Sequence, residues 1–169
     1  MSDGVNDSLM SHFLTPALIA RNRLPMLLAS ASHRHLEEFH RHFSGDDGLR
    51  LPPVYFYKGR IARWVTHTFH ISAITFGRRI FVKPELIERD AEGGWRVPGW
   101  LAAHETAHVL QYEAQGFFRF LVSYLRDYFR SLGGQTTWDK TARFASYSAI
   151  RAEREAREAE DAYTAWKEE

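Results

Sequence analysis

Residues 98–116 read PGWLAAHETAHVLQYEAQG, and this stretch decides the fold around it. A Pro-Gly pair stands where a helix can begin, a glycine stands where it can end, and the residues between them are compatible with helix. Most of these residues are apolar, so we expect a buried helix of at most about 17 residues. His104 and His108 are four positions apart, and their imidazoles therefore project from the same helix face, about one turn apart.

Two imidazoles on one helix face can bind a single metal ion, and Glu105, one position round, can reach a water molecule beside that ion. Zn²⁺ suits neutral imidazole nitrogens, and a catalytic zinc site keeps one position open for water. The ion lowers the pKa of that water from ~15.7 to ~7, so a neighbouring carboxylate can take its proton. The pattern predicts a zinc site with His104 and His108 as ligands and Glu105 as the general base. The alternative is that both histidines are structural residues of the core.

A catalytic zinc site needs a third protein ligand, and the sequence restricts where that ligand comes from. The chain has no cysteine, and no histidine follows His108, so a downstream carboxylate remains. Between Ala145 and Trp166, small and aromatic residues recur at steps of four and three. This stripe predicts one long helix over about residues 138–167 that lets another helix approach closely.

Helical geometry ranks the carboxylates of that segment. Glu153 lies at the edge of the stripe, among small neighbours that let the motif helix come near, and it ranks first. Glu160 recurs seven residues later on the same side and ranks second, whereas Glu155 and Glu158 point outward. Arg157 follows Glu153 by four positions, so an ordinary exposed ion pair is the open alternative.

Composition sets the broad class of protein. The chain has 169 residues, of which 44% are hydrophobic and 14% aromatic, and this predicts a single folded domain. The formal net charge of +1 gives no reason to expect nucleic acid as a partner. The first ten residues lack a basic segment followed by an apolar run, and no apolar stretch approaches the roughly 18 residues that span a bilayer. We therefore expect a cytoplasmic protein.

The other segments predict a mixture of helices and strands. Further helices are expected over residues 7–28, 30–43 and 117–132. Strands are expected at residues 54–57, within the β-branched and aromatic stretch 61–69, and in a tight hairpin of 73–76 with 79–82. A turn-rich stretch, 88–99, leads into the motif helix. The apolar side of the 117–132 helix is expected to face the core, and a membrane surface is the less favoured alternative.

Two further groups of residues carry weaker signals. Four histidines recur within the expected helix at His33, His35, His40 and His42. They can form a second metal site or a pH sensor, but the solvated face of a helix is the favoured interpretation. Three tyrosines are candidates to stabilise an oxyanion, and none is assigned: Tyr112, Tyr147 and Tyr163.

Together these residues resemble a known class of protein. His104-Glu-Thr-Ala-His108-Val-Leu-Gln, with Glu153-Arg-Glu-Ala far downstream, is similar to compact gluzincin-type metallopeptidases. In particular the chain resembles the small metallopeptidase domains, called minigluzincins, that are often found with bacterial contractile injection systems. The resemblance covers roughly residues 50–165 and includes the expected hairpin.

The resemblance implies an α+β, zincin-like single domain. Residues 51–169 would form the metallopeptidase core, and residues 1–50 a helical N-terminal extension of the same domain. A small, mostly antiparallel sheet would pack on the motif helix, and the long C-terminal helix would complete the metal site. The two motif histidines and Glu153 would bind Zn²⁺, and Glu105 would be the general base.

The implied function is the hydrolysis of peptide or protein substrates, with an extended peptide pairing with the exposed strand 80–82 beside the cleft. One residue departs from the pattern, because related gluzincins usually have Asp where this chain has Arg157. Loss of an acidic neighbour can loosen the orientation of a metal ligand. The alternative is therefore a metallopeptidase-like interaction domain, weak or inactive in catalysis, that binds cargo or a partner. An injection apparatus would also give such a protein a route of export.

Overall fold

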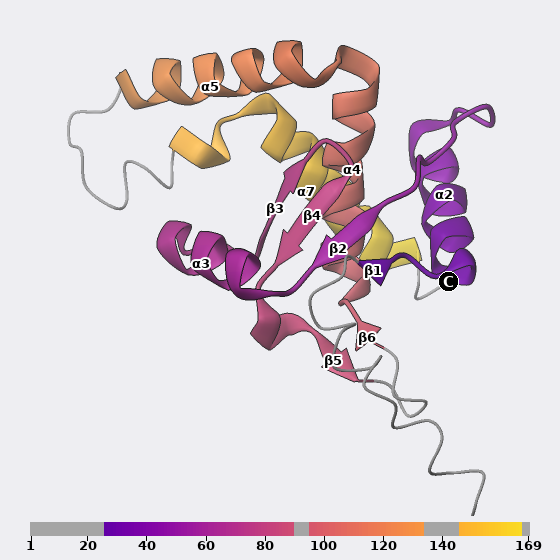
Figure 1. Cartoon of the computed structure of the whole chain (residues 1–169). Coiled ribbons are helices and arrows are strands. Elements are labelled where there is room, and N and C mark those ends of the chain that lie inside the picture. The colour runs from indigo at the N-terminus through magenta and orange to yellow at the C-terminus, as the bar shows by residue number, and fades with distance from the viewer. Residues whose placement is uncertain (1–25, 90–94, 134–145, 167–169) are drawn as a thin grey trace, which may run out of the picture.

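The structure is a computed structural model that describes residues 26–89, 95–133 and 146–166 of the chain. In these ranges the protein is an α+β fold, as the sequence predicts, with one four-stranded sheet, a separate two-stranded sheet and helices around them (Figure 1). Among the described helices, none is both long and apolar enough to cross a membrane.

The four-stranded sheet is mixed rather than mostly antiparallel. Its strands are β1 (Met26–Leu27), β2 (Tyr55–Tyr57), β3 (Ala73–Phe76) and β4 (Arg79–Val82), in the order β1-β2-β4-β3. β1–β2 and β3–β4 are antiparallel pairs, but the central pair, β2–β4, is parallel. The expectation of a mostly antiparallel sheet missed this pair, because a helix between β2 and β3 carries the chain past one strand position. The hairpin then returns β4 into that position, next to β2.

That connecting helix, α3 (Arg60–Phe69), corrects a prediction, since a strand was expected within residues 61–69. Ala62 and Thr66 are four positions apart and buried, whereas Ile61 and Trp64 are exposed. The Thr66 hydroxyl donates a hydrogen bond to the carbonyl of Ala62 (2.8 Å), as serine and threonine do within helices. The helical spacing of these two buried residues therefore outweighs the strand preference of the individual residues.

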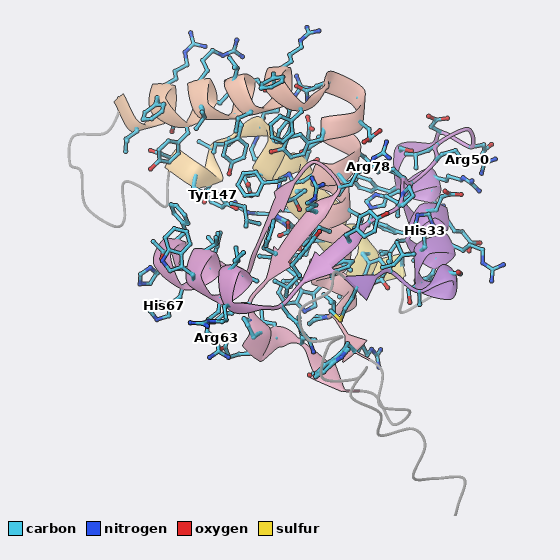
Figure 2. The ribbon with its side chains drawn as sticks, in the orientation of Figure 1. His33, Arg50, Arg63, His67, Arg78 and Tyr147 are labelled. Carbon is cyan, nitrogen blue, oxygen red and sulfur yellow. The ribbon has the colours of Figure 1, made fainter. Side chains whose placement is uncertain are left out.

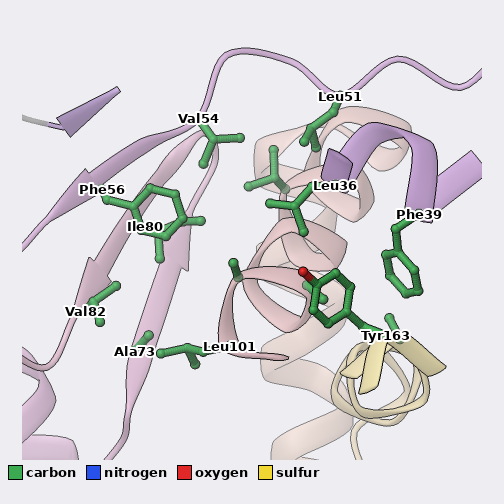
Figure 3. Close-up of a cluster of buried hydrophobic side chains, with 14 of the residues drawn as sticks. Leu36, Phe39, Leu51, Val54, Phe56, Ala73, Ile80, Val82, Leu101 and Tyr163 are labelled. Carbon is green, nitrogen blue, oxygen red and sulfur yellow. The ribbon is translucent and has the colours of Figure 1, made fainter. Parts of the chain in front are cut away.

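The expected hairpin is confirmed, and it supplies one wall of the core. Gly77 begins its two-residue turn with φ 58°, a left-handed conformation that favours glycine. Ile80 and Val82 alternate along β4 and are fully buried. They pack in a cluster that joins the sheet to helices α2, α4 and α7 (Figure 3).

The remaining elements lie close to their predicted positions, with two exceptions. Three expected helices are confirmed with ends within one residue: α2 (Ser30–Ser44), α4 (Gly99–Gln115) and α5 (Phe117–Gly133). The turn-rich stretch before α4 contains a two-stranded sheet of β5 (Glu88–Arg89) and β6 (Trp95–Arg96), and a short 3₁₀ helix, η2 (Pro84–Leu86), precedes it. Of the helix expected over 7–28, residues 26–27 form β1, and residues 7–25 lie outside the described residues.

The C-terminal helix, α7 (Arg151–Trp166), starts later than expected. Residues 146–148 form a separate helical turn, Ile150 is not helical, and residues 138–145 lie outside the described residues. Ile150 is fully buried, and its carbonyl accepts the backbone N–H of Arg154 at 3.1 Å. The chain is therefore not helical at the buried residue Ile150, and the single helix predicted from the sequence is divided there.

α4 runs between the sheet and α7, and α5 lies across its C-terminal end (Figure 1). The approach of α4 to α7 is close, because α7 presents Ala156 and Ala159, both fully buried. At the start of α4, a Cβ added to Gly99 would lie 2.6 Å from the ring of Tyr163, so no larger residue fits there without a shift. This close packing brings the inner face of α7 onto the histidines of α4.

Candidate metal centre

His104 and His108 on α4 and Glu153 on α7 meet at one point in the protein. The Nε2 atom of His104 lies 3.6 Å from Oε2 of Glu153, and Nε2 of His108 lies 3.4 Å from Oε1. One potential ligand atom from each residue lies within 4.8 Å of the other two, so the three can hold a metal ion. His108 and Glu153 are buried, and 12% of the His104 side chain is exposed, which leaves the site a contact with solvent.

The outer nitrogen of each imidazole is held by an acceptor. Nδ1 of His104 lies 3.0 Å from Oε2 of Glu160, and Nδ1 of His108 lies 2.8 Å from Oε1 of Gln111. The orientation of the Gln111 amide is fixed, because its Nε2 donates to the carbonyl of Ala152 (3.1 Å) and to Glu155 (3.0 Å). Both Nδ1 atoms therefore carry a proton, and both Nε2 atoms face Glu153, which is the orientation that metal-binding histidines require once Nε2 is deprotonated.

The two carboxylate oxygens of Glu153 differ in their hydrogen bonds. Oε1 accepts a hydrogen bond from the hydroxyl of Tyr124 at 2.8 Å, and Tyr147 also hydrogen-bonds this carboxylate. Oε2 is buried and has no hydrogen-bond partner among the described residues. Nε2 of His104 thus faces Oε2, and Nε2 of His108 faces Oε1, so that two imidazole nitrogens and a carboxylate surround one point. Such a set of ligand atoms fits a cation.

The pKa shifts of His108 and Glu153 also indicate a site that favours positive charge. Burial lowers the pKa of His108, but hydrogen bonding and charge attraction from Glu153 outweigh it and raise this pKa to about 9. Burial also raises the pKa of Glu153, and the hydrogen bonds with His104 and His108 outweigh that effect and lower it. The carboxylate is therefore charged at neutral pH and stabilises a cation beside it.

Glu105 lies next to this centre, on the side of the sheet. Its Oε2 accepts a hydrogen bond of 2.6 Å from the hydroxyl of Thr75 on β3, and only 4% of the residue is exposed. Burial raises the pKa of Glu105, and charge attraction from His108 and His104 opposes this increase. A carboxyl group with a raised pKa is suited to accept and return a proton near neutral pH.

The structure brings together the three residues that the sequence nominated as ligands, and their role as ligands stays a prediction. The second-ranked carboxylate, Glu160, holds the outer nitrogen of His104 instead of joining the cluster. Glu158 is exposed, as expected, and Glu155 is half-buried in its contact with Gln111.

Sequence reasoning missed three residues around the centre. Gln111 lies three positions after His108, so helical spacing was a signal that could have found it. Thr75 and Tyr124 come from β3 and α5, and nothing in their local sequence marks them as neighbours of Glu105 and Glu153.

Arg157, where the resemblance to gluzincins predicts an acidic residue, does not deprive His104 of a carboxylate. Its guanidinium carbon lies 5.7 Å from the ring centroid of Tyr147, which Figure 2 labels on the segment before α7. Glu160, seven residues after Glu153 and on the same helix face, takes the place beside His104.

Of the three tyrosines singled out from the sequence, one lies at the centre. Burial raises the pKa of Tyr147, and the charge of Glu153 raises it further, so its phenol stays protonated. The hydroxyl of Tyr163 contacts a different residue, since it lies 3.1 Å from Nε2 of His35. Tyr112 stacks on the ring of Phe117.

The histidines of α2 form no second metal site among the described residues. The expectation of a solvated face is wrong for His40, which is 2% exposed. Its Nε2 lies 2.8 Å from the hydroxyl of Thr106. That hydroxyl donates to the carbonyl of Ala102 (2.6 Å), so His40 is the donor to Thr106. Burial lowers the pKa of His40 to about 4, which makes it a neutral tie between α2 and α4.

The strand expected to pair with substrate is not at an edge. Residues 80–82 belong to β4, which is flanked by β2 and β3. The free edge near the metal centre belongs to β3, since no described strand pairs with its outer side. The physical reason is again the return of the hairpin into the middle of the sheet.

Comparison with known proteins links part of the chain to one family. Residues 35–116 match the family model of the eCIS core domain and thereby link the protein to extracellular contractile injection systems. The matched stretch runs from α2 to the end of α4, so it contains both histidines and Glu105 but not Glu153. Comparisons with curated proteins and with solved structures gave no match.

Proposed function

We propose that the protein is a zinc-dependent peptidase whose metal ligands are His104, His108 and Glu153. The observation that carries this proposal is the donor set at the centre. The two Nε2 atoms, each on an imidazole whose Nδ1 is held by an acceptor, face the carboxylate of Glu153, and its Oε2, on the side of His104, has no hydrogen-bond partner among the described residues. A bound zinc ion would supply a Lewis acid that polarises a carbonyl and makes water acidic near neutral pH.

In this proposal Glu105 moves the proton. Its carboxylate accepts a proton from the attacking water and delivers it to the nitrogen of the leaving amine. The Thr75 hydroxyl orients the carboxylate through Oε2, while burial keeps its pKa raised. Tyr124 and Tyr147 hold Glu153 in place from the opposite side.

The proposed substrate is an extended peptide that pairs with the free edge of β3. Backbone pairing with an exposed strand gives affinity without demanding a particular sequence. β3 also carries Thr75, so the strand that would hold the peptide is the one that orients Glu105. The similarity to the eCIS core domain supports a place for this activity in an injection system, including export by that route.

A second candidate function is a non-catalytic interaction domain that retains the metal centre for stability. Two features favour it: Glu105 is almost completely buried, and Arg157 stands at the position where the resemblance to gluzincins predicts an acid. In that case the protein would bind cargo or a partner of an injection apparatus.

One set of measurements distinguishes the two candidates. The full-length protein is purified, its zinc content is measured, and a mixture of unstructured peptides is analysed for cleavage before chelation, after chelation and after zinc is restored. The peptidase proposal expects about one zinc per chain, cleavage that follows the zinc, and loss of cleavage in Glu105→Gln with zinc retained. Zinc binding without any cleavage would support the interaction domain, and absence of zinc binding would overturn both proposals.

A further inference from the structure

Helix α5 buries part of its apolar side, as expected, since Phe120 is buried and Tyr124 is half-buried in its contact with Glu153, but it also carries a stripe of large apolar side chains on its outer side. Phe120 and Leu132 are buried, but five other apolar residues are exposed, and all of these except Phe117 lie on one outer stripe. The exposed fractions are 79% for Phe118, 65% for Val122, 44% for Leu125 and 61% for Phe129. We call these four residues the α5 seam.

The spacing of the α5 seam is that of a helix–helix contact. Its residues follow one another at steps of four, three and four, which is the alternation of the d and a positions of a heptad repeat. On a helical wheel they span only about 60°. In-plane membrane helices bury a wider apolar face, so this narrow seam fits a second helix better than a lipid surface.

Arginines line one flank of the α5 seam. Arg119 and Arg126 each follow a d residue and occupy the e position, where charges pair with the opposite helix, and Arg130 extends the row. A groove of about 500 Å³ runs between the apolar and basic residues, and it is lined by Gln115, Phe118, Arg119, Val122, Ser123 and Arg126. The acidic residue of the helix, Asp127, projects away from the seam and lies 3.4 Å from Arg126.

We propose that the α5 seam docks an amphipathic helix of a partner protein that carries glutamate or aspartate along one flank. Apolar residues of that helix would cover the seam, and its carboxylates would pair with Arg119 and Arg126, because guanidinium groups bind carboxylates through two parallel hydrogen bonds. A second copy of this chain is a poorer partner, since its own arginines would face these in an antiparallel pair and find no acid in a parallel one. The seam lies outside the stretch that matches the eCIS core domain, and the proposal is independent of the metal centre.

The test uses two fluorescent peptides of about three heptads, both with leucine at a and d. One has glutamate at e and g, the other lysine, so each repels itself and stays monomeric. Binding to the full-length protein is followed by fluorescence anisotropy. The wild type is expected to bind the glutamate peptide about tenfold more tightly than the lysine peptide, and the double variant R119E/R126E is expected to reverse this preference. Phe118→Asp is expected to weaken binding of the glutamate peptide by tenfold or more.

The matched control is R34E/R154E, which makes the same charge change at exposed arginines of α2 and α7 and is expected to keep the wild-type preference. Circular dichroism melting curves are recorded to check that each variant is folded. Equal binding of both peptides by the wild type, or an unchanged preference in R119E/R126E, would overturn the proposal. It would also be overturned if Phe118→Asp abolished flotation with vesicles of roughly three parts phosphatidylcholine to one part phosphatidylserine, or dissolved a dimer seen by light scattering.

Discussion

Two helices of this protein bury histidine, and the two environments are electrostatically opposite. His40 on α2 donates from Nε2 to Thr106, and burial lowers its pKa to about 4. His108 on α4 is buried to a similar degree, but Glu153 lies 3.4 Å from its Nε2, and its pKa rises to about 9. Burial therefore does not distinguish the proposed metal ligand from the structural histidine. The distinction depends on which nitrogen is held by an acceptor and on what faces the other nitrogen.

The largest expected effect is a loss of peptide cleavage without a loss of zinc binding. Glu105→Gln should lower the turnover of a cleaved peptide by about 10²–10⁴-fold, because the amide cannot accept the proton of the attacking water. Its zinc content, measured by mass spectrometry, should remain that of the wild type. Glu158→Gln, on the exposed side of α7, is the matched control and should be fully active. Equal turnover by Glu105→Gln and the wild type would exclude the proposed mechanism.

The second prediction is that removing the charge of Glu153 makes the pKa of His108 on α4 shift toward the behaviour of buried His40 on α2. In Glu153→Gln the main charge that raises the pKa of His108 is removed, whereas burial, Glu105 and Gln111 remain. In the metal-free protein this pKa should fall from about 9 toward its ordinary value of 6.5, as measured by NMR titration of the imidazole protons. Zinc affinity, measured by competition with a chelator, should fall by more than about 100-fold. A His108 pKa that stays near 9 would show that Glu153 is not the cause.

The third prediction concerns His40 and the pH dependence of stability. Because the pKa of His40 is about 4 in the folded protein and about 6.5 when unfolded, the unfolded state binds more protons between these values. The stability that neutral His40 contributes is complete above pH 6.5 and should decrease by about 3 kcal/mol as the pH falls to 4. Urea unfolding of the wild type and of His40→Gln at pH 7 and pH 4 measures this difference. If both proteins lose the same free energy of unfolding, His40 is not protonated in this way.

The smallest effect concerns the residue that holds His104 from outside. Glu160→Gln should weaken zinc binding by about 10–100-fold, because the proton on Nδ1 loses a charged acceptor and the imidazole loses its fixed orientation. Glu158→Gln on the same helix should bind zinc like the wild type. Equal affinities of the two variants would mean that Glu160 does not compensate for the presence of Arg157.

The elements that could be predicted from the sequence are those whose pattern is local. The motif helix has a Pro-Gly start and a glycine after its end, and the hairpin has two apolar runs around a two-residue turn. The start of α7 and the character of α3 could not be predicted in this way. Burial of Ile150 interrupts one pattern, and burial of Ala62 and Thr66 gives helical spacing to a stretch of strand-forming residues. These outcomes depend on tertiary contacts.

The same division holds for the candidate site. The spacing of His104 and His108 and the stripe around Glu153 placed three residues on two helix faces, and the structure brings these faces together. The parts that orient them come from side chains whose contacts no periodicity reveals. Thr75 reaches Glu105 from an edge strand, and Tyr124 reaches Glu153 from α5, whose apolar pattern predicted a core contact but not which residue it would meet.

Diffraction from a zinc-loaded crystal, recorded above and below the zinc absorption edge, tests the central claim most directly. We expect one anomalous peak per chain at about 2.0–2.2 Å from Nε2 of His104, Nε2 of His108 and one oxygen of Glu153. No peak at this point, or a zinc ion bound by the two histidines with Glu153 turned away, would contradict the proposed metal centre.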